Sequence, residues 1–313
     1  MRKLRIAVIG AGHLGTYHTK MYHLLKRSAG IDLVGVADIN EQKAKDLAKK
    51  YKTAYYANPK ALIGKVDAVS IAVPTSLHYS VAKDFLEAGV HVLIEKPITK
   101  TLFEADELIR LANAKNLIIQ VGHIERFNPA VLAMEPFLDK PKFIESQRLG
   151  SIKNKSRIKD VGVVLDLMIH DIDIILALVN SKVKSIVAFG QSTVSEHEDV
   201  ANVRLTFEDN TIADITASRV TKEEVRKLRI FQERSYILLD YMDHEVYIYK
   251  KQRSNRFKKN KLRLRKTNAL MVELKSFIDC IKRKTKPLVS GKEGREALSV
   301  ALDILDKIHS RAK

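Results

Sequence analysis

The first 122 residues alternate between two patterns of apolar and polar positions. Short, nearly continuous apolar runs predict strands that are buried on both faces. The segments between them repeat their apolar residues at helical spacing, which predicts helices. The predicted strands lie at residues 5–9, 32–38, 67–73, 91–95 and 117–121, and the predicted helices at 41–50, 77–88 and 101–115. A parallel sheet covered by helices on both faces, ending near Gly122, accounts for this alternation.

Beyond residue 123 the pattern changes to strands with few helices between them. A run of strands after a helix predicts a large, mostly antiparallel open sheet with one covered face. The expected strands lie at residues 143–150, 200–207, 211–217, 225–239 and 245–249, and the expected helices at 163–179, 269–284 and 291–310. We therefore predict an α/β fold of two domains, residues 1–122 and 123–313, with the C-terminal helix able to pack back on the first domain.

Composition narrows the class of protein. With 313 residues, 45% of them hydrophobic and 29% charged, the chain is long enough for two soluble domains with separate cores. No apolar stretch approaches the roughly 18 residues of a membrane span, and the first glycines interrupt the N-terminal apolar run too early for a signal peptide. The single cysteine, Cys280, cannot form an internal disulfide. We therefore expect a cytoplasmic protein without membrane insertion, in which this thiol is packed in the core.

The net charge of +18 points to anionic partners, either nucleic acid or small acidic ligands. Its densest part is the stretch Lys250 to Lys266. No helix-turn-helix, zinc-finger or RNA-binding sheet pattern surrounds this stretch, so a solvated hairpin is favoured and nucleic acid is not an expected partner. Attraction of a phosphorylated substrate is the milder functional interpretation of the same cations.

Three glycines, Gly10, Gly12 and Gly15, follow the first strand and precede a helical pattern. In the strand, turn and helix that cradle a dinucleotide pyrophosphate, the first glycine allows the turn and the second admits the phosphates to the backbone. The third allows the helix to pack on the strand, and the anion rests on N–H groups at the positive end of the helix. The motif therefore predicts a Rossmann domain with a dinucleotide site.

The second strand ends in Asp38, about 20 residues after the glycine turn. A carboxylate at this place accepts hydrogen bonds from the adenosine ribose hydroxyls and repels a 2′-phosphate. The next residues, Ile39 and Asn40, add no arginine that could receive such a phosphate. This favours NAD over NADP as the cofactor. The alternative is that Asp38 serves only as an acid at the start of the next helix.

Two more segments follow strand ends, where open α/β sheets bind their ligands. In Glu95-Lys96-Pro97, the lysine would project a cation into the crevice, whereas a surface lysine before a turn is the alternative. The turn Pro74-Thr75-Ser76-Leu77-His78 is expected near the nicotinamide half of the cofactor. A plain helix cap by Thr75 or Ser76 explains that turn equally well.

Asp166, His170 and Asp173 are spaced so that they share one face of the predicted helix at residues 163–179. A histidine with a carboxylate one turn before it is suited to act as a general base, because the carboxylate orients the ring and supports its charged form. The alternatives are an exposed polar face with a helical ion pair, or a metal site. A lysine aimed at the same place works against a bound cation, so we expect no metal. The apolar residues Leu165, Ile169, Ile172 and Leu176 share another face.

The segment from Gly122 to Pro129 lies where the two predicted domains meet. Arg126 is available there for an anionic or hydroxyl-rich ligand. Asn128, followed by proline, begins a helix, so a capping asparagine is the structural interpretation of that residue.

Taken together, the glycine turn, Asp38, the segment from Pro74 to His78, the lysine motif and the spacing of Asp166 and His170 resemble the Gfo/Idh/MocA family of NAD(P)-dependent sugar and cyclitol oxidoreductases. The resemblance runs over essentially the whole chain. It implies that Lys96 is a catalytic lysine that also touches the nicotinamide ribose, His170 the acid/base and Asp166 its partner. The cofactor residues implied are Gly10, Gly12, His13, Leu14, Gly15, Asp38, Pro74, Thr75, His78, Glu95 and Lys96. The substrate residues implied are Lys96, Arg126, Asn128, Asp166 and His170.

One departure concerns the substrate. Many members have two or three glycines just before the catalytic helix, whereas residues 160–164 retain only Gly162. The segments at residues 122–129 and 166–173 look most like members that oxidise the 3-hydroxyl of UDP-N-acetylglucosamine toward a 3-amino sugar for lipid A. Inositol or another free or phosphorylated sugar is the alternative substrate. A non-catalytic dinucleotide sensor or nucleic-acid scaffold is the alternative function, and a homodimer or tetramer formed through the second sheet is expected.

Overall fold

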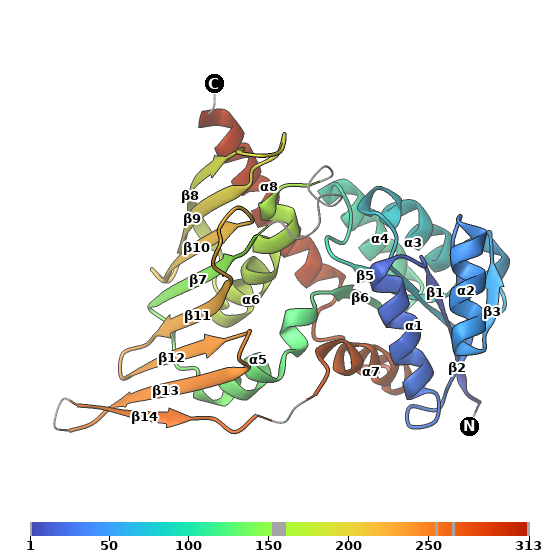
Figure 1. Cartoon of the computed structure of the whole chain (residues 1–313), viewed down its shortest axis with the longest axis horizontal. Coiled ribbons are helices and arrows are strands. Elements are labelled where there is room, and N and C mark those ends of the chain that lie inside the picture. The colour runs from blue at the N-terminus through green and yellow to red at the C-terminus, as the bar shows by residue number, and fades with distance from the viewer. Residues whose placement is uncertain (1, 152–160, 254–255, 265–266, 312–313) are drawn as a thin grey trace. The chain divides into compact units, whose positions relative to one another are not determined.

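The computed structural model describes residues 2–151, 161–253, 256–264 and 267–311. The chain divides into two compact units, each made of two segments. Unit 1 comprises residues 1–127 and 267–295, and unit 2 comprises residues 128–266 and 296–313. Each unit has its own sheet and its own hydrophobic core, and Figure 1 shows the elements of both.

Unit 1 contains a six-stranded parallel sheet with the strand order β3-β2-β1-β4-β5-β6. The order reverses between β1 and β4, the position at which open α/β sheets bind ligands. This confirms the predicted Rossmann architecture. Its strands are β1 (Leu4–Ile9), β2 (Ile31–Ala37), β3 (Ala54–Tyr56), β4 (Ala68–Ile71), β5 (His91–Glu95) and β6 (Ile119–Gly122). Its helices are α1 (His13–Leu25), α2 (Glu41–Tyr51), α3 (His78–Glu87) and α4 (Leu102–Ala114), with the short turns η1 (Pro59–Leu62), η2 (Thr75–Leu77) and η3 (Ile124–Phe127).

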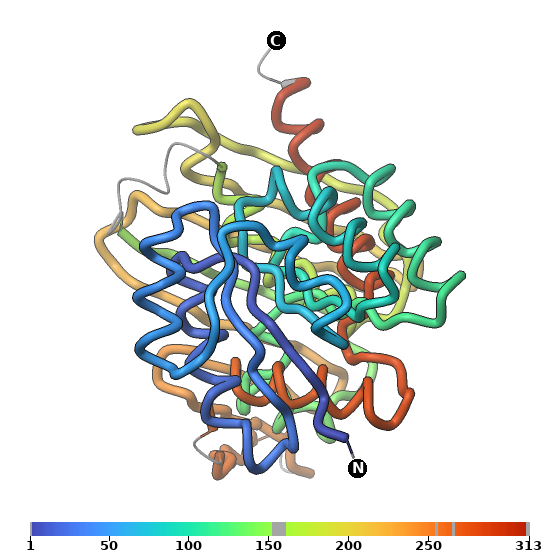
Figure 2. Tube along the Cα trace, turned by 90° about the vertical axis from the view of Figure 1, so that its right-hand side faces the viewer, coloured from blue at the N-terminus to red at the C-terminus, as the bar shows by residue number. Residues whose placement is uncertain are grey.

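Helix α7 (Ala269–Arg283) also belongs to unit 1. Its side chains Leu274 and Phe277 are buried in one cluster with Met21 and Tyr22 of α1. Figure 2 shows this helix, in dark orange, against the blue elements of the unit. The predicted single second domain at residues 123–313 therefore differs from the structure in this segment. The reason is that the apolar face of α7 is buried against α1. A late part of the chain therefore folds onto unit 1.

Unit 2 contains an eight-stranded sheet with the order β14-β13-β12-β11-β7-β10-β9-β8. Every neighbouring pair is antiparallel except β7 and β10, which are parallel. The predicted large, mostly antiparallel sheet is therefore confirmed. Its strands are β7 (Phe143–Leu149), β8 (Val183–Gln191), β9 (Val200–Phe207), β10 (Ile212–Ser218), β11 (Val225–Phe231), β12 (Ser235–Asp240), β13 (Glu245–Lys251) and β14 (Phe257–Lys261).

Helices cover one face of this sheet. Alternate side chains of β9 and β10 are buried, as expected for strands with one covered face. The buried cluster joins these side chains to residues of α5, α6 and the later part of α8. The helical elements are α5 (Pro129–Met134), η4 (Glu135–Phe137), the π-helical turn η6 (Val164–Met168), α6 (Ile169–Val179) and α8 (Gly291–Arg311), which begins in unit 1.

Two strands, β11 and β12, replace the single strand predicted at residues 225–239. The N–H of Gln232 donates to the carbonyl of Ser235 at 2.9 Å and closes a hairpin turn over Glu233 and Arg234. That turn contains no glycine, proline or asparagine, so the local pattern carries no turn signal. The pattern also fails to predict β3 and β8, and it gives no strand bounds for β14.

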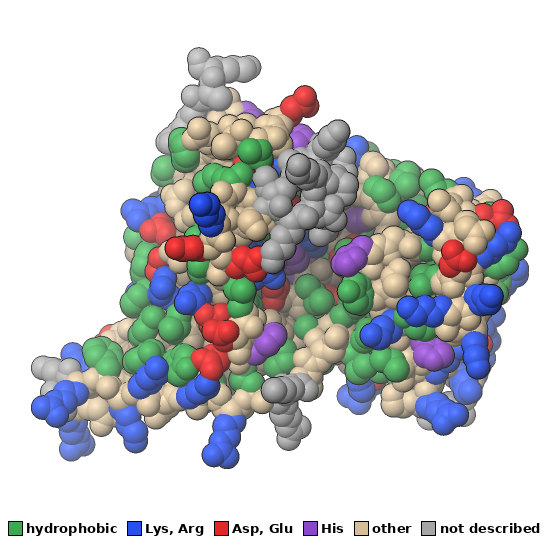
Figure 3. Space-filling model, viewed as in Figure 1, with side chains coloured by type: hydrophobic (Ala, Val, Ile, Leu, Met, Phe, Trp, Pro, Cys, Tyr) green, Lys and Arg blue, Asp and Glu red, His purple; other side chains and the backbone are tan. Residues whose placement is uncertain are grey.

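The most basic part of the chain, Lys250 to Lys266, overlaps the β13–β14 hairpin. All five residues of β14 are exposed, and Lys and Arg side chains gather over the hairpin in Figure 3. Lys259 places its ammonium 3.9 Å from the ring centroid of Tyr247, a cation–π contact that shields the ring. Lysines on an edge strand also discourage pairing with another chain. The predicted solvated hairpin is thus present, although residues 254–255 and 265–266 of the basic stretch lie outside the described residues.

Candidate active site

The glycine turn has the geometry of a phosphate cradle. Gly10 adopts a φ of +103°, and a Cβ there would lie 2.3 Å from the carbonyl oxygen of Ala72. A Cβ on Gly15 would lie 1.9 Å from the carbonyl oxygen of Gly10, so this glycine permits α1 to pack on the turn. At Gly12, by contrast, no described atom lies within 4 Å of an added Cβ, and no side chain caps the helix. The start of α1 is therefore open to an anion, and these residues fit a dinucleotide pyrophosphate.

Asp38 links the glycine turn to the start of α2. Its Oδ2 accepts a hydrogen bond from the N–H of Ala11 at 2.6 Å, and its Oδ1 accepts one from the N–H of Asn40 at 2.7 Å. The cap of α2 is Asn40 itself, whose Oδ1 accepts from the N–H of Lys43. Because Asn40 does the capping, Asp38 is not needed as the helix-start acid. Its half-exposed carboxylate lies beside the turn, as a ribose-binding acid requires.

His78 joins the loops that follow β4 and β5. Its Nδ1 lies 2.8 Å from the carbonyl oxygen of Pro97, and its Nε2 lies 2.9 Å from that of Val73. Burial lowers the pKa of this histidine, although both carbonyl contacts oppose the shift. The side chain that was predicted to contact the cofactor is thus engaged within the protein. Ahead of it, Pro74 is exposed and Thr75 is half-buried at the start of η2.

Glu95 points into the interior of unit 1. Its Oε1 lies 2.9 Å from Nε2 of His18, whose Nδ1 lies 2.7 Å from Oγ of Ser70. Burial acts to raise the pKa of Glu95, but the hydrogen bond and charge of His18, together with the cation of Lys96, hold it below its usual value. This buried chain of hydrogen bonds ties α1 to the carboxyl ends of β4 and β5. Glu95 therefore supports the strand end that carries Lys96.

Lys96 itself is half-buried directly after β5 and precedes a cis proline, Pro97. His123, which follows β6, is fully buried. Burial, together with the nearby cations of Lys96 and Arg126, lowers the pKa of His123 to about 3, so this ring is neutral at physiological pH. Arg126 lies in η3 and is buried rather than freely available at the surface. A neutral histidine beside two cations is a feature that the sequence pattern does not assign.

In unit 2, Asn128 caps α5. Its Oδ1 accepts a hydrogen bond from the N–H of Ala130 at 3.0 Å, which confirms the structural interpretation of this residue.

The helix with Asp166 and His170 departs from the predicted regular α-helix. Its first five residues, Val164–Met168, form a π-helical turn, and the α-helix begins only at Ile169. Asp166 lies in the π-helical turn and His170 just after it, and both are half-buried. Asp173 is buried, so the alternative of an exposed polar face does not hold for this residue. A π-helical turn carries more residues than an α-helical turn, which rotates the preceding positions relative to those that follow.

Asp171 anchors this helix to the sheet. Its Oδ2 accepts from Nε of Arg148 at 2.8 Å, and its Oδ1 accepts from Nη2 of Arg148 at 3.1 Å and from Oγ of Ser146 at 2.9 Å. The guanidinium also lies over the ring of Tyr241, 5.3 Å from its centroid. Both charged side chains are buried. The bidentate pair fixes the rotation of α6 relative to β7 and hence the direction of its neighbour His170.

Neither a membrane-spanning helix nor a metal cluster is found in the part of the chain that the structure describes. No helix there is long and apolar enough to cross a membrane. No group of three or more His, Cys, Asp or Glu side chains in the same residues is arranged to hold a metal ion.

Comparison with known proteins assigns the family. The model of the oxidoreductase family with an NAD-binding Rossmann fold, GFO_IDH_MocA, matches residues 4–123, and the Gfo/Idh/MocA C-terminal domain matches residues 142–237. The UDP-N-acetylglucosamine 3-dehydrogenase of Acidithiobacillus ferrooxidans is 34% identical over 310 residues, 97% of each chain. The chain belongs to the Gfo/Idh/MocA oxidoreductase family. It is therefore a dehydrogenase with an NAD-binding Rossmann domain.

Solved structures and a second sequence relative extend this likeness. A structure of the same Acidithiobacillus ferrooxidans enzyme matches with a TM-score of 0.93 over 99% of each chain. The scyllo-inositol 2-dehydrogenase (NAD⁺) of Bacillus subtilis is 26% identical over 324 residues, 96% of this chain and 92% of its own. Levoglucosan dehydrogenase in complex with NADH has a TM-score of 0.89 but only 17% identity, over 98% of this chain and 97% of its own, and shows the fold alone.

The predicted cofactor residues divide into two groups: those that line the cradle and those that are hydrogen-bonded within the protein. Gly10, Gly12, Gly15 and Asp38 form one continuous cradle, beside which His13 is exposed and Leu14 half-buried. Glu95 and His78 are hydrogen-bonded within unit 1. Long-range partners such as His18 and Arg148 carry no local pattern and are found only in the folded chain.

Proposed function

We propose that this chain oxidises the 3-hydroxyl of UDP-N-acetylglucosamine to the 3-oxo sugar with NAD as the cofactor. The observation that carries the proposal is the full-length similarity, 34% identity and a TM-score of 0.93, to an enzyme named for that reaction. The inositol dehydrogenases, at 26% and 25% identity, are more distant. The product suits amination toward the 3-amino sugar of lipid A in the cytoplasm. The excess of positive charge suits a diphosphate substrate.

The cradle around Gly12 would hold the pyrophosphate of NAD, and Asp38 would accept hydrogen bonds from the adenosine ribose. When bound, NAD supplies the nicotinamide carbon that accepts a hydride. The carboxylate of Asp38 would repel the 2′-phosphate of NADP. We therefore expect NAD to be the better cofactor.

Catalysis in this proposal rests on Lys96 and His170. His170 takes the proton of the sugar hydroxyl as a general base, and Asp166 supports its charged form. Lys96 stabilises the negative charge that develops on the oxygen and orients the hydroxyl. Glu95, buried behind Lys96, holds the strand end in place through His18. The proposed substrate contacts are Lys96, Arg126, Asn128, Asp166 and His170.

A substrate panel tests this function. The purified chain is incubated with NAD or NADP and with UDP-N-acetylglucosamine, scyllo-inositol, myo-inositol or free N-acetylglucosamine, and the absorbance of the reduced nicotinamide is followed. We expect turnover with UDP-N-acetylglucosamine and NAD at least about tenfold above the other pairs, because a site that binds a polar group discriminates strongly against analogues that lack it. Faster turnover of an inositol would instead identify the enzyme as an inositol dehydrogenase. No turnover, together with nucleic-acid binding at physiological salt, would favour the scaffold alternative.

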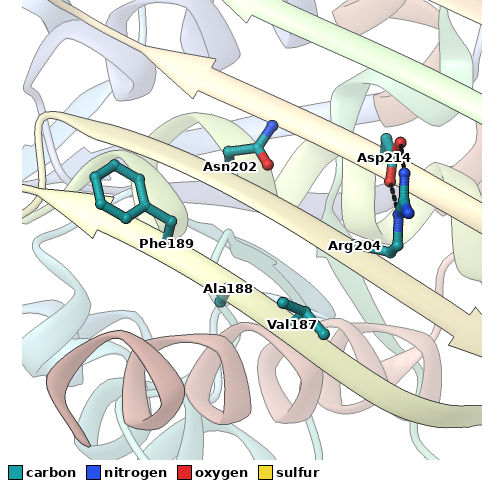
Figure 4. Close-up of a pocket in the computed structure, with 6 residues that line it drawn as sticks. All are labelled: Val187, Ala188, Phe189, Asn202, Arg204 and Asp214. Atoms are coloured by element: carbon teal, nitrogen blue, oxygen red, sulfur yellow. Dashed lines mark hydrogen bonds and ion pairs between the residues drawn. The ribbon is translucent and has the colours of Figure 1, made fainter. Parts of the chain in front are cut away.

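We also propose that the exposed face of the unit 2 sheet pairs two copies of the chain. The rings of Phe143, Phe231, Tyr236 and Tyr249 form a row across four strands, with centroid distances of 5.6, 4.9 and 5.0 Å. At the other edge Val187 and Phe189 are 51% and 56% exposed. They line a hollow with Arg204 and Asp214, whose ion pair neutralises both charges (Figure 4). An extended face with exposed apolar groups and internally paired charges suits burial against its own copy.

Light scattering coupled to gel filtration tests the pairing. We expect the wild-type chain, 35.4 kDa, to elute at twice that mass or a higher multiple. Phe189→Asp should shift it toward the monomer, because pairing would bury the new charge. The matched control is Phe103→Asp at an exposed position of α4, which should leave the mass unchanged. A monomeric wild type would refute the proposal.

A further inference from the structure

A buried polar cluster in unit 2 holds the segment that enters the catalytic helix. We name Glu198, Asp199 and Arg219 the helix anchor. The guanidinium of Arg219 donates from Nη1 to the carbonyl of Val161 at 2.8 Å. The backbone carbonyl of Glu198 accepts from the N–H of Val163 at 2.9 Å, and its Oε1 accepts from the N–H of Val164 at 3.0 Å. Backbone groups of three residues in this segment are therefore bound by the anchor.

The anchor is itself rigid. Asp199 Oδ2 accepts from the N–H groups of Thr193, Val194 and Ser195, and its Oδ1 accepts from Nε of Arg219 at 2.7 Å. Burial acts to raise the pKa of Asp199, but these hydrogen bonds outweigh it and hold the pKa well below its usual value. All three side chains are nine-tenths or more buried, and Glu198 is only 5% exposed. The anchor is therefore a fixed point from which the next segment starts.

Gly162 packs directly against the helix anchor, where there is no room for a side chain. A Cβ at this position would lie 1.9 Å from Oε1 and 2.1 Å from Cδ of Glu198. Any other residue would have to displace the buried carboxylate. The steric requirement accounts for a glycine at position 162 and shows that the glycine and Glu198 act as one unit.

The π-helical turn begins at the residue that the anchor holds. Val164 is the first residue of η6, and its N–H donates a hydrogen bond to the Glu198 carboxylate. The N–H of Asp166 then donates to the carbonyl of Gly162 at 3.0 Å. Single π-helical turns are rare and are frequent at functional sites, where they redirect side chains. The turn here lies between the anchor and His170, so its shape sets the relative direction of Asp166 and His170.

We propose that Glu198 is a positioning residue that maintains the π-helical turn and thereby aligns Asp166 and His170 for proton transfer. The inference rests on the proposed function of those two residues. Glu198 does not touch the reacting atoms; it acts through the backbone of residues 162–168. Loss of its side-chain acceptor leaves the N–H of Val164 buried without that partner, which favours rearrangement of the turn.

The test compares Glu198→Ala with Glu198→Gln, which keeps an oxygen acceptor for Val164. We expect Glu198→Ala to lower kcat about 30-fold, because misplacement of a catalytic group by about 1 Å can cost 100-fold, with KM for NAD changed less than about twofold. Glu198→Gln should keep kcat within about threefold. The pH profile of kcat should shift to lower pH in Glu198→Ala, because a base separated from its carboxylate has a lower pKa. The matched control is Glu196→Ala, an exposed acid in the same loop.

Gly162→Ala provides a second route to the same state, because the added methyl displaces the Glu198 carboxylate. It should match Glu198→Ala in both kcat and pH profile. Hydrogen exchange of the amides of residues 164–170 gives a readout that does not need turnover, and both variants should exchange faster there than wild type.

The outcomes are separable. A lower melting temperature with unchanged kcat, pH profile and exchange at residues 164–170 would make Glu198 merely structural and overturn the inference. An inactive wild type would refute the proposed function instead, and the exchange measurement would still decide whether Glu198 maintains the turn.

Discussion

His170→Ala should lower kcat by about a thousandfold, because a positioned general base contributes roughly 100- to 10,000-fold. Lys96→Ala should lower kcat by about 100-fold or more, because one preorganised group at a developing oxyanion is worth about that much. Neither change alters the cradle at Gly10, Gly12 and Gly15. NAD binding, measured by titration calorimetry, should therefore stay within about threefold of wild type in His170→Ala. For Lys96→Ala a somewhat larger loss is expected, since this lysine is proposed to touch the nicotinamide ribose.

Two exposed residues provide matched controls for these variants. Lys100→Ala removes a lysine four residues after Lys96, and His309→Ala removes an exposed histidine of α8. Both controls should retain wild-type kcat. Normal turnover in His170→Ala or Lys96→Ala would remove that residue from the mechanism, and loss of NAD binding in proportion to kcat would reassign it to the cofactor site.

Asp171→Ala should destabilise unit 2 by about 3–5 kcal/mol, because removal of one partner of a buried, bidentate ion pair is strongly destabilising. The side chain of Arg148 is only 5% exposed, so it has little contact with water in the folded state. Urea denaturation followed by circular dichroism measures this loss as a lower midpoint.

The double variant Asp171→Leu with Arg148→Met separates pairing from packing. It should recover most of the lost stability, because apolar residues of similar volume replace both charges. The comparison on an exposed pair is Asp106→Ala, which removes the partner of Arg295 and should cost about 0–1 kcal/mol. A single variant as stable as wild type would show that Arg148 reaches another counter-charge.

The parallel sheet of unit 1 could be predicted because its strands have a recognisable local pattern of apolar residues. Apart from β3, which is short and largely exposed, each is a short apolar run, and β1, β4 and β5 are buried on both faces as those runs imply. The sheet of unit 2 could be predicted in kind but not in detail. The exposed, basic sequence of its edge strand β14 indicates a solvated hairpin but not the strand bounds, and the β11–β12 turn has no turn residues to mark it. Helix α7 lies late in the chain and packs on α1, which no periodicity indicates.

The same division holds at the candidate site. Gly10, Gly12, Gly15 and Asp38 could be recognised because their roles depend on backbone conformation and close spacing along the chain. The spacing of Asp166 and His170 likewise marked one helix. The π-helical turn η6 was missed, because helical spacing alone assumes a regular α-helix.

The amino-acid sequence alone determined the Rossmann turn, the preference for NAD and the two candidate catalytic side chains, because these depend on residue type and short spacing. The tertiary structure decided which partners hold them in place. His18 reaches Glu95 across 77 positions, and Glu198 reaches Val164 across 34. Such pairs form only when separate elements pack, and burial then makes each hydrogen bond hard to replace by water. Gly162 illustrates the difference. The sequence shows that position 162 is a glycine, but only the folded structure shows that the Glu198 carboxylate leaves no room for a side chain there.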